Sequence, residues 1–433
     1  MNKIKWYSTT NHHFWTELEY VAENADPQST IETTGQTDQS IDGFGGCFNE
    51  LGGIALEKLS EQDREALMDL LFAPDGEGLR LNYNRLPIGA SDYAESWYSY
   101  DEAKNDYAME HFSIERDKAY LLPYLQAGLK RNPSMTLFSS PWSPPTWMKF
   151  PQAYNYGRLV WTKENLEAYA LYFAKYIEAY AKENIKIDQI HIQNEPFADQ
   201  KFPSCLWSGE QFREFIGCFM GPLFDKLGLN VEIFLGTLNG DENNYDEYAN
   251  NIFHDPEASR YVKGVSYQWA GKYSLAITHE SWPEKTIIQS ENECGDGRND
   301  WNYARYIFRL FRHYLSNGVN AYVYWNMILE KDGMSTWGWT QNSMITVNED
   351  ATYTLNPEFY VMKHFSRFIC PGAKRLCLKG HWTGSSVAFQ NPDGSTVLVT
   401  QNPYKEAKTV SFTHEGQQYT FTLPSDSFNT IVL

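Results

Sequence analysis

The sequence predicts an α/β protein made of a (β/α)8 barrel with a side β-sandwich. Between residues 43 and 326, apolar strand-like runs alternate with amphipathic helical stretches, a pattern typical of a closed parallel sheet. After residue 359 the pattern changes to short alternating strands separated by turn signals. The length of 433 residues suits a barrel of about 250 residues or more with one smaller domain.

The barrel prediction depends on eight strand-helix units. Strands are expected at residues 43–48, 81–89, 135–139, 189–193, 231–236, 262–267, 286–290 and 321–325. Helices are expected at residues 60–72, 115–130, 163–182, 209–227 and 301–316. Within residues 163–182, Leu166, Tyr169, Phe173 and Ile177 recur at helical spacing. Eight such repeats imply that the sheet closes into a barrel.

The sandwich is expected to combine both ends of the chain. A helix at residues 357–368 precedes strands at 385–390, 396–400, 409–413, 419–423 and 430–433, and strand-like pieces occur at 14–20 and 31–34. We therefore divide the chain into N-terminal strands (1–40), a catalytic barrel (41–356), and a linking helix with the C-terminal sandwich (357–433). Because the sequence has no low-complexity linker, the two parts should pack rigidly.

Composition excludes several classes of function. The net charge of -19 argues against binding nucleic acid, whose phosphates attract basic patches. No apolar run approaches the ~20 residues that a membrane span needs, and the opening residues are polar, which predicts a cytoplasmic protein, or a secreted one whose leader has been removed. The six cysteines are scattered without a CxxC pair, and the ten histidines show no HExxH spacing. We expect free thiols, no metal and no cofactor.

Polar and aromatic residues mark the predicted strand ends, where barrel enzymes carry their functional groups. In chain order these are Arg85 with Asp92, Trp142, Asn194-Glu195, Gln268-Trp269, Glu291 and Trp325-Asn326. Two glutamates on different strands meet the requirement of glycoside hydrolysis, in which one carboxyl protonates the leaving oxygen and the other attacks the anomeric carbon or activates a water. Glu293 competes with Glu291 because both have the same strand parity, but Glu291 lies nearer the strand end and is favoured.

Several motifs in order resemble those of glycoside hydrolase family 30, the glucosylceramidases and related β-glycosidases, over nearly the whole chain. They are Gly43-Phe44-Gly45-Gly46, Arg85-Leu86-Pro87-Ile88-Gly89, Ser140-Pro141-Trp142-Ser143-Pro144-Pro145, Gln193-Asn194-Glu195-Pro196 and Ser290-Glu291. The resemblance implies that Glu195 is the general acid/base and Glu291 the nucleophile of a retaining enzyme. It also implies that Asn194 binds the sugar 2-hydroxyl, and that Asp92, Trp142 and Trp325 line the subsite of the non-reducing sugar.

One segment departs from the family pattern. Where the family commonly has a His-Trp-Tyr-like run at the end of strand six, this chain has Gln268-Trp269-Ala270. The tyrosine expected to hydrogen-bond the nucleophile is therefore replaced, and Tyr267 and Gln268 are the candidates for its role.

The expected function is exo-acting, β-glucosidase-like hydrolysis of a carbohydrate or glycoconjugate. Alternatives in the same family are a β-xylosidase, a β-1,6-glucanase or a xylanase. From other classes, the alternatives are a non-catalytic carbohydrate-binding protein on the same fold and a purely structural barrel. The sequence leaves the linkage, the aglycone and the oligomeric state open.

Overall fold

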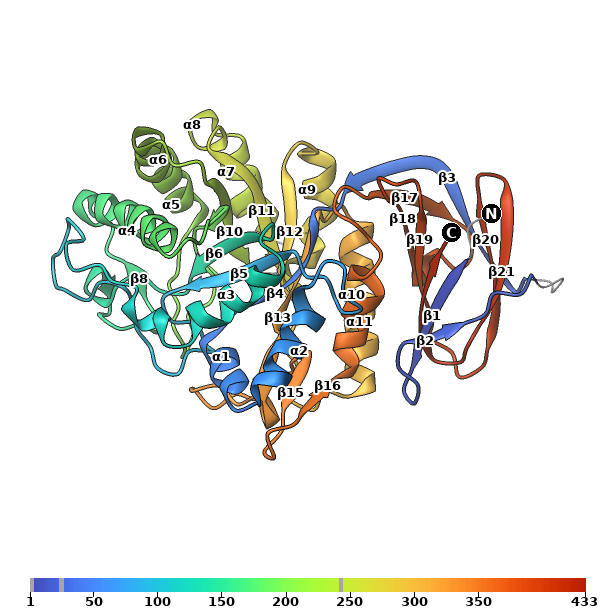
Figure 1. Cartoon of the computed structure of the whole chain (residues 1–433). Coiled ribbons are helices and arrows are strands. Elements are labelled where there is room, and N and C mark those ends of the chain that lie inside the picture. Colours follow the sequence, from blue (N-terminus) through green and yellow to red (C-terminus); the bar gives the residue numbers. More distant parts are fainter. Residues whose placement is uncertain (1–3, 23–26, 241–243) are drawn as a thin grey trace.

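The computed structural model describes residues 4–22, 27–240 and 244–433. Its larger part is a closed barrel with strand order β10-β11-β12-β13-β4-β5-β6-β9, in which every pairing is parallel. The strands are β4 (Gly43–Cys47), β5 (Tyr83–Ile88), β6 (Thr136–Pro141), β9 (Gln189–His191), β10 (Glu232–Leu238), β11 (Val262–Gln268), β12 (Thr286–Glu291) and β13 (Ala321–Asn326). The predicted fold class is confirmed (Figure 1).

Helices surround the barrel. They are α1 (Glu50–Glu57), α2 (Glu61–Phe72), α3 (Leu121–Arg131), α4 (Lys163–Lys182), α5 (Gly209–Glu214), α6 (Gly221–Leu227), α7 (Asn251–Phe253), α8 (Pro256–Ser259), α9 (Leu275–Ser281), α10 (Trp301–Ser316) and α11 (Pro357–Ser366). The expected helix at 209–227 contains a π-helical turn, Phe215–Met220, between α5 and α6. The expected helix at 115–130 is a 3-10 turn, Glu115–Lys118, followed by α3.

The barrel interior is a packed core rather than a channel. Its apolar layer consists of Tyr83, Phe138, Phe234, Ile288, Ala321 and Val323. His191 is stacked between Phe138 and Phe234 at centroid distances of 4.4 and 4.7 Å, and burial lowers its pKa well below the usual value. His191 is therefore a neutral core residue. Gly45 is required by packing, since a Cβ there would lie 1.6 Å from the carbonyl oxygen of Tyr83.

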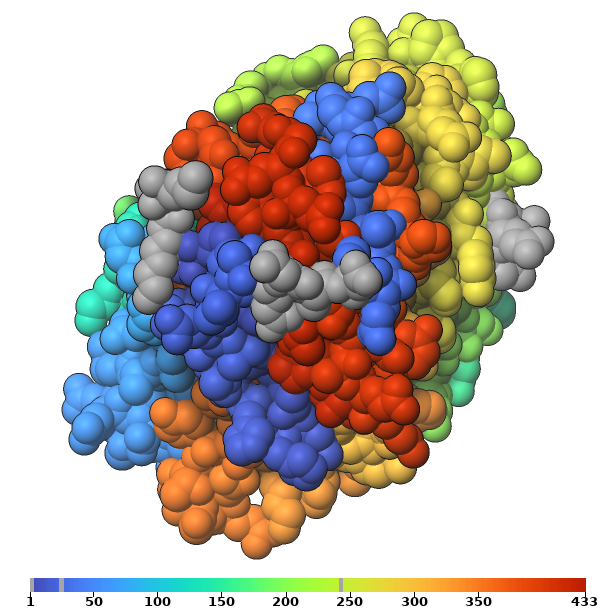
Figure 2. Space-filling view, turned by 90° about the vertical axis from the view of Figure 1, so that its right-hand side faces the viewer, coloured from blue at the N-terminus to red at the C-terminus, as the bar shows by residue number. Residues whose placement is uncertain are grey.

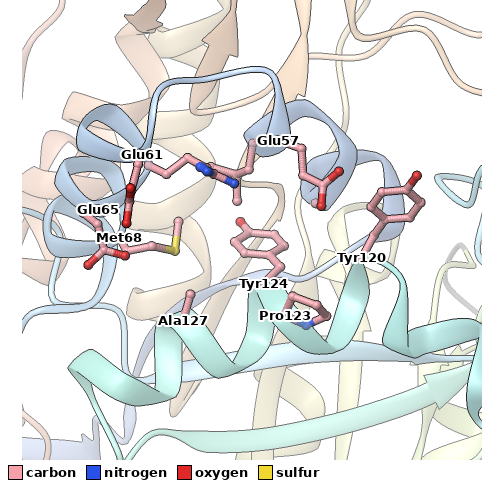
Figure 3. Close-up of a pocket in the computed structure, with 11 residues that line it drawn as sticks. Glu57, Glu61, Glu65, Met68, Tyr120, Pro123, Tyr124 and Ala127 are labelled. Carbon is pink, nitrogen blue, oxygen red and sulfur yellow. The ribbon is translucent and has the colours of Figure 1, made fainter.

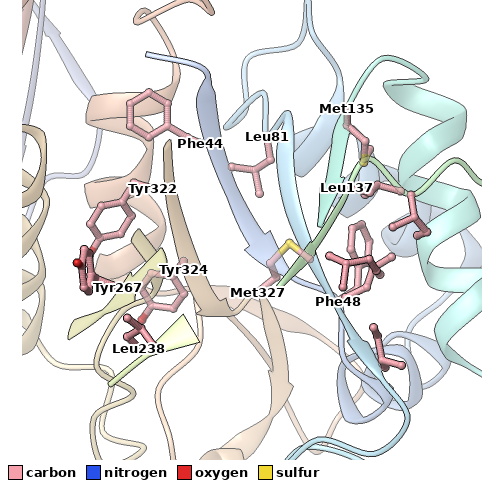
Figure 4. Close-up of a cluster of buried hydrophobic side chains, with 14 of the residues drawn as sticks. Phe44, Phe48, Leu81, Met135, Leu137, Leu238, Tyr267, Tyr322, Tyr324 and Met327 are labelled. Atoms are coloured by element: carbon pink, nitrogen blue, oxygen red, sulfur yellow. The ribbon is translucent and has the colours of Figure 1, made fainter. Parts of the chain in front are cut away.

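A larger apolar cluster fills the space between the barrel strands and the surrounding helices. Figure 4 shows part of it, with Phe44, Tyr322 and Tyr324 on one side and Phe48, Met135 and Leu137 on the other. This layer holds the strand ends in fixed positions, which the chemistry of a site at those ends requires. In the part of the chain that the structure describes, no helix is long and apolar enough to cross a membrane.

The second part is a β-sandwich whose nine strands are ordered β2-β1-β22-β19-β18-β17-β3-β20-β21. They are β1 (Lys5–Thr10), β2 (Thr16–Leu18), β3 (Ser29–Ser40), β17 (Lys374–Lys379), β18 (Ser386–Gln390), β19 (Thr396–Asn402), β20 (Lys408–His414), β21 (Gln417–Leu423) and β22 (Ser427–Val432). The N-terminal strands lie at two places in this order, β2 and β1 at one edge and β3 between β17 and β20, and Figure 2 shows the blue and red surfaces interleaved. All pairings are antiparallel except β3 with β20.

Helices α10 and α11 join the sandwich to the barrel (Figure 1). The buried His364 of α11 makes hydrogen bonds with Thr430 of β22 at 2.8 Å and Thr9 of β1 at 2.9 Å. Arg305 of α10 forms an ion pair with Asp426. These polar contacts fix the orientation of the sandwich against α10 and α11.

Small strands complete the connections. β7 (Lys149–Phe150) pairs with β8 (Arg158–Leu159) after the third barrel strand. β14 (Ile328–Glu330), β15 (Ile345–Val347) and β16 (Tyr353–Leu355) form a three-stranded sheet after the eighth. This sheet anchors the long loop that follows β13 and passes close to the functional residues described below.

Candidate active site

Glu195 lies four residues beyond β9, the fourth strand of the barrel. Its backbone has a φ of 46°, a left-handed conformation that is costly for a residue with a side chain. Its amide donates to the carbonyl oxygen of Thr237 at 3.1 Å, and its Oε1 accepts a hydrogen bond from Asn239 Nδ2 at 3.1 Å. The strained backbone and the contacts from β10 and the loop after it direct the carboxyl to the strand ends.

Glu291 is the last residue of β12, the seventh strand, and is 5% exposed. Its Oε2 accepts hydrogen bonds from Arg85 Nη1 at 2.6 Å and from Gln268 Nε2 at 3.1 Å. The thiol of Cys294 lies 3.8 Å from Oε1. Glu291 is thus a buried carboxylate paired with a cation, and Oε1 is its more weakly held oxygen.

Asn194 directly precedes Glu195 and shares two hydrogen-bond donors, Arg85 and Gln268, with Glu291. Its Oδ1 accepts hydrogen bonds from Arg85 Nη2 at 2.7 Å, Thr237 Oγ1 at 2.8 Å and Gln268 Nε2 at 2.9 Å. Because three donors converge on the oxygen, the amide orientation is fixed and Nδ2 is left as a donor on the other side.

Two tryptophans form the apolar part of the site. Trp142, directly after β6, and Trp325 of β13 are each 1% exposed, and their ring centroids are 5.3 Å apart. The guanidinium of Arg85 lies 4.6 Å from the centroid of Trp142 and 5.3 Å from that of Trp325. The same arginine therefore contacts Glu291, Asn194 and both rings.

Asp92 is the third carboxyl of the site. It is 6% exposed and bonded by the side chain of Gln341, which in turn accepts a hydrogen bond from Asn326 Nδ2 at 2.8 Å. Burial raises the pKa of Asp92 to about 7, and the negative charge of Glu195 adds to the rise.

The environments of Glu195 and Glu291 separate their acidities. Burial raises the pKa of Glu195 to about 8, and the nearby charge of Glu291 adds to this rise. Burial also raises the pKa of Glu291, but the adjacent Arg85 opposes it and favours the anion. Glu291 therefore loses its proton first, and Glu195 holds a proton near neutral pH.

Loops close one side of the barrel mouth. Tyr93, after β5, donates to the carbonyl oxygen of Gly333 at 2.6 Å, and Thr336 donates to that of Ala94 at 3.1 Å. Phe202, after β9, contacts Trp337, after β13, at a centroid distance of 5.1 Å. Since β9 and β13 are the fourth and eighth strands, this contact crosses the mouth and leaves the ends of β4, β5 and β6 on the closed side.

The structure places Glu293 apart from this group. It borders a separate surface cavity with Asp296, Asp300 and Tyr303, and its carbonyl oxygen accepts a hydrogen bond from Tyr303 at 2.6 Å. Of the two competing glutamates, Glu291 is the one in contact with Arg85 and Gln268.

Another cavity, of about 230 Å³, lies outside the barrel among helices α1, α2 and α3 (Figure 3). Glu57, Glu61 and Glu65 border it from one side and Tyr120 and Tyr124 from the other. Its lining comes from the helix layer rather than from the strand ends.

All six residues that the sequence singled out, Asp92, Trp142, Asn194, Glu195, Glu291 and Trp325, lie at the carboxyl ends of the barrel strands. Of the two candidates for the missing tyrosine, Gln268 contacts Glu291, whereas the hydroxyl of Tyr267 bonds Thr278 at 2.8 Å. Sequence analysis missed Thr237 and Asn239 at the end of β10. Their signal was the polar Thr-Leu-Asn that follows the apolar run of that strand.

The barrel with paired carboxyls at its fourth and seventh strand ends, flanked by tryptophans, defines the class of glycoside hydrolases. Comparison with known families agrees. Residues 41–369 match the glycosyl hydrolase family 30 TIM-barrel domain, and residues 372–431 match the family 30 beta sandwich domain. The chain belongs to glycosyl hydrolase family 30.

Relatives within the family differ in their named activities. The chain is 31% identical to putative glucosylceramidase 2 of Caenorhabditis elegans, over 88% of this chain and 78% of that protein. It is 29% identical to endo-1,6-beta-D-glucanase neg1 of Aspergillus fumigatus, over 94% and 88%. The solved structure of the endo-beta1,6-glucanase BT3312 is similar with a TM-score of 0.88 and 25% identity, covering 99% of this chain and 98% of that one.

Proposed function

We propose that this glycoside hydrolase cleaves β-glycosidic bonds with retention of configuration and releases a terminal, glucose-like sugar. Glu291 is the nucleophile and Glu195 the general acid/base. The observation that carries this proposal is the asymmetry of the pair: Glu291 is bonded by the cation of Arg85, whereas Glu195 is bonded by the neutral amide of Asn239.

In the first step, Glu291 Oε1 attacks the anomeric carbon while the bond to the leaving oxygen breaks, and that oxygen takes the proton of Glu195. A glycosyl ester of Glu291 results. Esterification removes the negative charge that raises the pKa of Glu195. The pKa of Glu195 therefore falls, and its carboxyl ionises more readily. In the second step it takes a proton from water, whose oxygen attacks the anomeric carbon and frees Glu291.

The other polar groups suit a single sugar. Asn194 Nδ2, oriented by the three donors on Oδ1, can donate to the sugar 2-hydroxyl. Asp92 can bind two adjacent hydroxyls, while Trp142 and Trp325 offer flat apolar surfaces. The loop contacts Tyr93 to Gly333 and Thr336 to Ala94 join the residues directly after Asp92 to the loop after β13, and they support exo action because they oppose the passage of further sugars on that side.

The test combines two variants with azide. Glu195→Ala should still be glycosylated by a nitrophenyl β-glucoside, whose leaving group needs no proton, and azide should speed its turnover. Glu291→Ala should lose the covalent step, and azide should give a glycosyl azide of inverted configuration. Full activity in Glu291→Ala together with loss of activity in Glu293→Ala would show that Glu293 is the nucleophile. A wild type that binds sugars but cleaves no β-glycoside would instead be a carbohydrate-binding protein.

Because two relatives are named endo-1,6-beta-D-glucanase, endo cleavage of a glucan is the second candidate function. Product analysis separates the two. With an oligosaccharide labelled at its reducing end, exo action shortens the labelled chain by one sugar at a time, whereas endo action releases internal fragments from the start.

A further inference from the structure

An open cavity of about 550 Å³ adjoins the side of the site that the loop contacts do not close. It is lined by residues from the loops after β9, β10 and β11: Phe197, Asn239, Gly240, Trp269, Ala270, Lys272 and Tyr273. Its volume lies in the range of about 300–1,000 Å³ that is usual for ligand sites.

The cavity is connected to Glu195 through Asn239 and to Glu291 through Trp269 and its chain neighbour Gln268. Asn239, which lines it, donates to Glu195 Oε1 at 3.1 Å. Trp269, which also lines it, follows Gln268, the residue that donates to Glu291 Oε2 at 3.1 Å. A general acid must face the leaving oxygen of its substrate, so a cavity beside Glu195 is where the leaving group is expected.

We propose that this cavity is the leaving-group subsite and that it binds a sugar rather than a lipid chain. The inference rests on the proposed function, because it assumes that Glu195 protonates the leaving oxygen. It adds the chemical class of the leaving group, which then makes the substrate a β-linked oligosaccharide.

The lining supports a sugar because it joins aromatic rings to a polar donor. The ammonium of Lys272 lies 5.0 Å from the ring centroid of Tyr273 and 5.7 Å from that of Trp269, and it donates to the carbonyl oxygen of Trp269 at 3.1 Å. Tyr273 is 67% exposed. Sugar C–H faces pack on such rings, and sugar hydroxyls accept from the remaining ammonium protons. A hydrocarbon chain would instead remove water from the ammonium without replacing its hydrogen bonds, which is unfavourable.

The test measures kcat/KM for four substrates relative to one another. β-1,6- and β-1,4-linked glucose disaccharides carry a sugar leaving group, glucosylceramide in detergent micelles carries a lipid one, and β-glucosyl fluoride has a leaving group too small to occupy the cavity. The variants are Tyr273→Ala and Lys272→Met. Tyr404→Ala is the control, because Tyr404 is 53% exposed in the sandwich part, away from the barrel mouth.

In Tyr273→Ala, the ratio of kcat/KM for the preferred disaccharide to that for the fluoride should fall about tenfold, which corresponds to about 1.4 kcal/mol. Lys272→Met should lower the same ratio, and Tyr404→Ala should leave it as in the wild type. Unchanged disaccharide ratios in an enzyme that hydrolyses the fluoride would overturn the subsite alone. So would a fall confined to glucosylceramide. A wild type inactive on the fluoride as well would remove the proposed function and the subsite together.

Discussion

Arg85 Nη1 lies 2.6 Å from Glu291 Oε2 in a region where the arginine side chain is fully buried and the glutamate nearly so. The same guanidinium donates to Asn194 and stacks on Trp142. A single residue of the second strand therefore sets the charge of the nucleophile and the position of a sugar-binding amide.

Replacing Arg85 should damage both functions. Arg85→Met leaves Glu291 buried without its cation, a change that typically costs about 3–5 kcal/mol. Because Arg85 lowers the pKa of Glu291, the acid limb of the kcat/KM profile should move to higher pH. Arg85→Lys keeps the charge but loses the fork that reaches two acceptors, so it should recover part of the activity. A profile unchanged in Arg85→Met would contradict the role of the ion pair.

Asn239 should control the position of the alkaline limb in the pH profile of kcat/KM. Its amide bonds Glu195 and lowers the pKa of that carboxyl, because it stabilises the anion. Asn239→Ala removes this bond, so the pKa of Glu195 should rise and the alkaline limb, set by loss of the Glu195 proton, should move to higher pH. Kinetic profiles between pH 5 and 10 measure the shift. A movement to lower pH would show that Asn239 acts in another way.

Glu195 should make the protein less stable in alkaline solution. Its pKa is raised in the folded state to about 8, so its contribution to stability is present below the unfolded value near 4.5 and is lost as pH rises through 8. Glu195→Gln stays neutral and should raise Tm at pH 9, with a free-energy gain on the order of a few kcal/mol, and change it little at pH 5. Thermal unfolding at both pH values, with Glu293→Gln as the control at a half-buried carboxyl outside this group, checks this expectation.

Gln268 and Cys294 contact different oxygens of Glu291, and replacing them should lower kcat/KM to different extents. Gln268 Nε2 bonds both Glu291 and Asn194, so Gln268→Leu leaves two buried acceptors with one donor fewer and should lower kcat/KM by about tenfold or more. The thiol of Cys294 is a weak donor at 3.8 Å, and Cys294→Ala should cost less than Gln268→Leu. The reverse order would identify the thiol as the main partner of the nucleophile.

The sequence predicted the barrel because its signals are local. Runs such as Ile287-Ile288 and Val262 to Tyr267 mark strands, and the strand ends bring Glu195 and Glu291 to one face once the sheet closes. β1 and β17 were not predicted. Their strand character depends on pairing with distant partners, Thr430 for Tyr7 and Thr37 for Leu376.

Sequence analysis missed some residues of the site for the same reason, because their roles depend on contacts with distant parts of the chain. Nothing near Asn239 in the chain indicates that it bonds Glu195, since the contact spans two barrel strands. The choice of Gln268 over Tyr267 follows from strand parity, because alternate residues of β11 face opposite sides of the sheet. The contact between Phe202 and Trp337 depends on two long loops, which have no periodic signal.

The interleaved sandwich also constrains how the chain is made. β3 pairs with β17 and β20, and β1 pairs with β22, so the N-terminal strands emerge from the ribosome long before their partners exist. At a synthesis rate of about 5–20 residues per second, the interval between Ser40 and Lys374 lasts on the order of 20–60 s. During that time the strands expose unpaired edges, which are prone to associate with other chains. The translation of β22, the partner of β1, therefore ends the period in which these N-terminal strands are open to association with other chains.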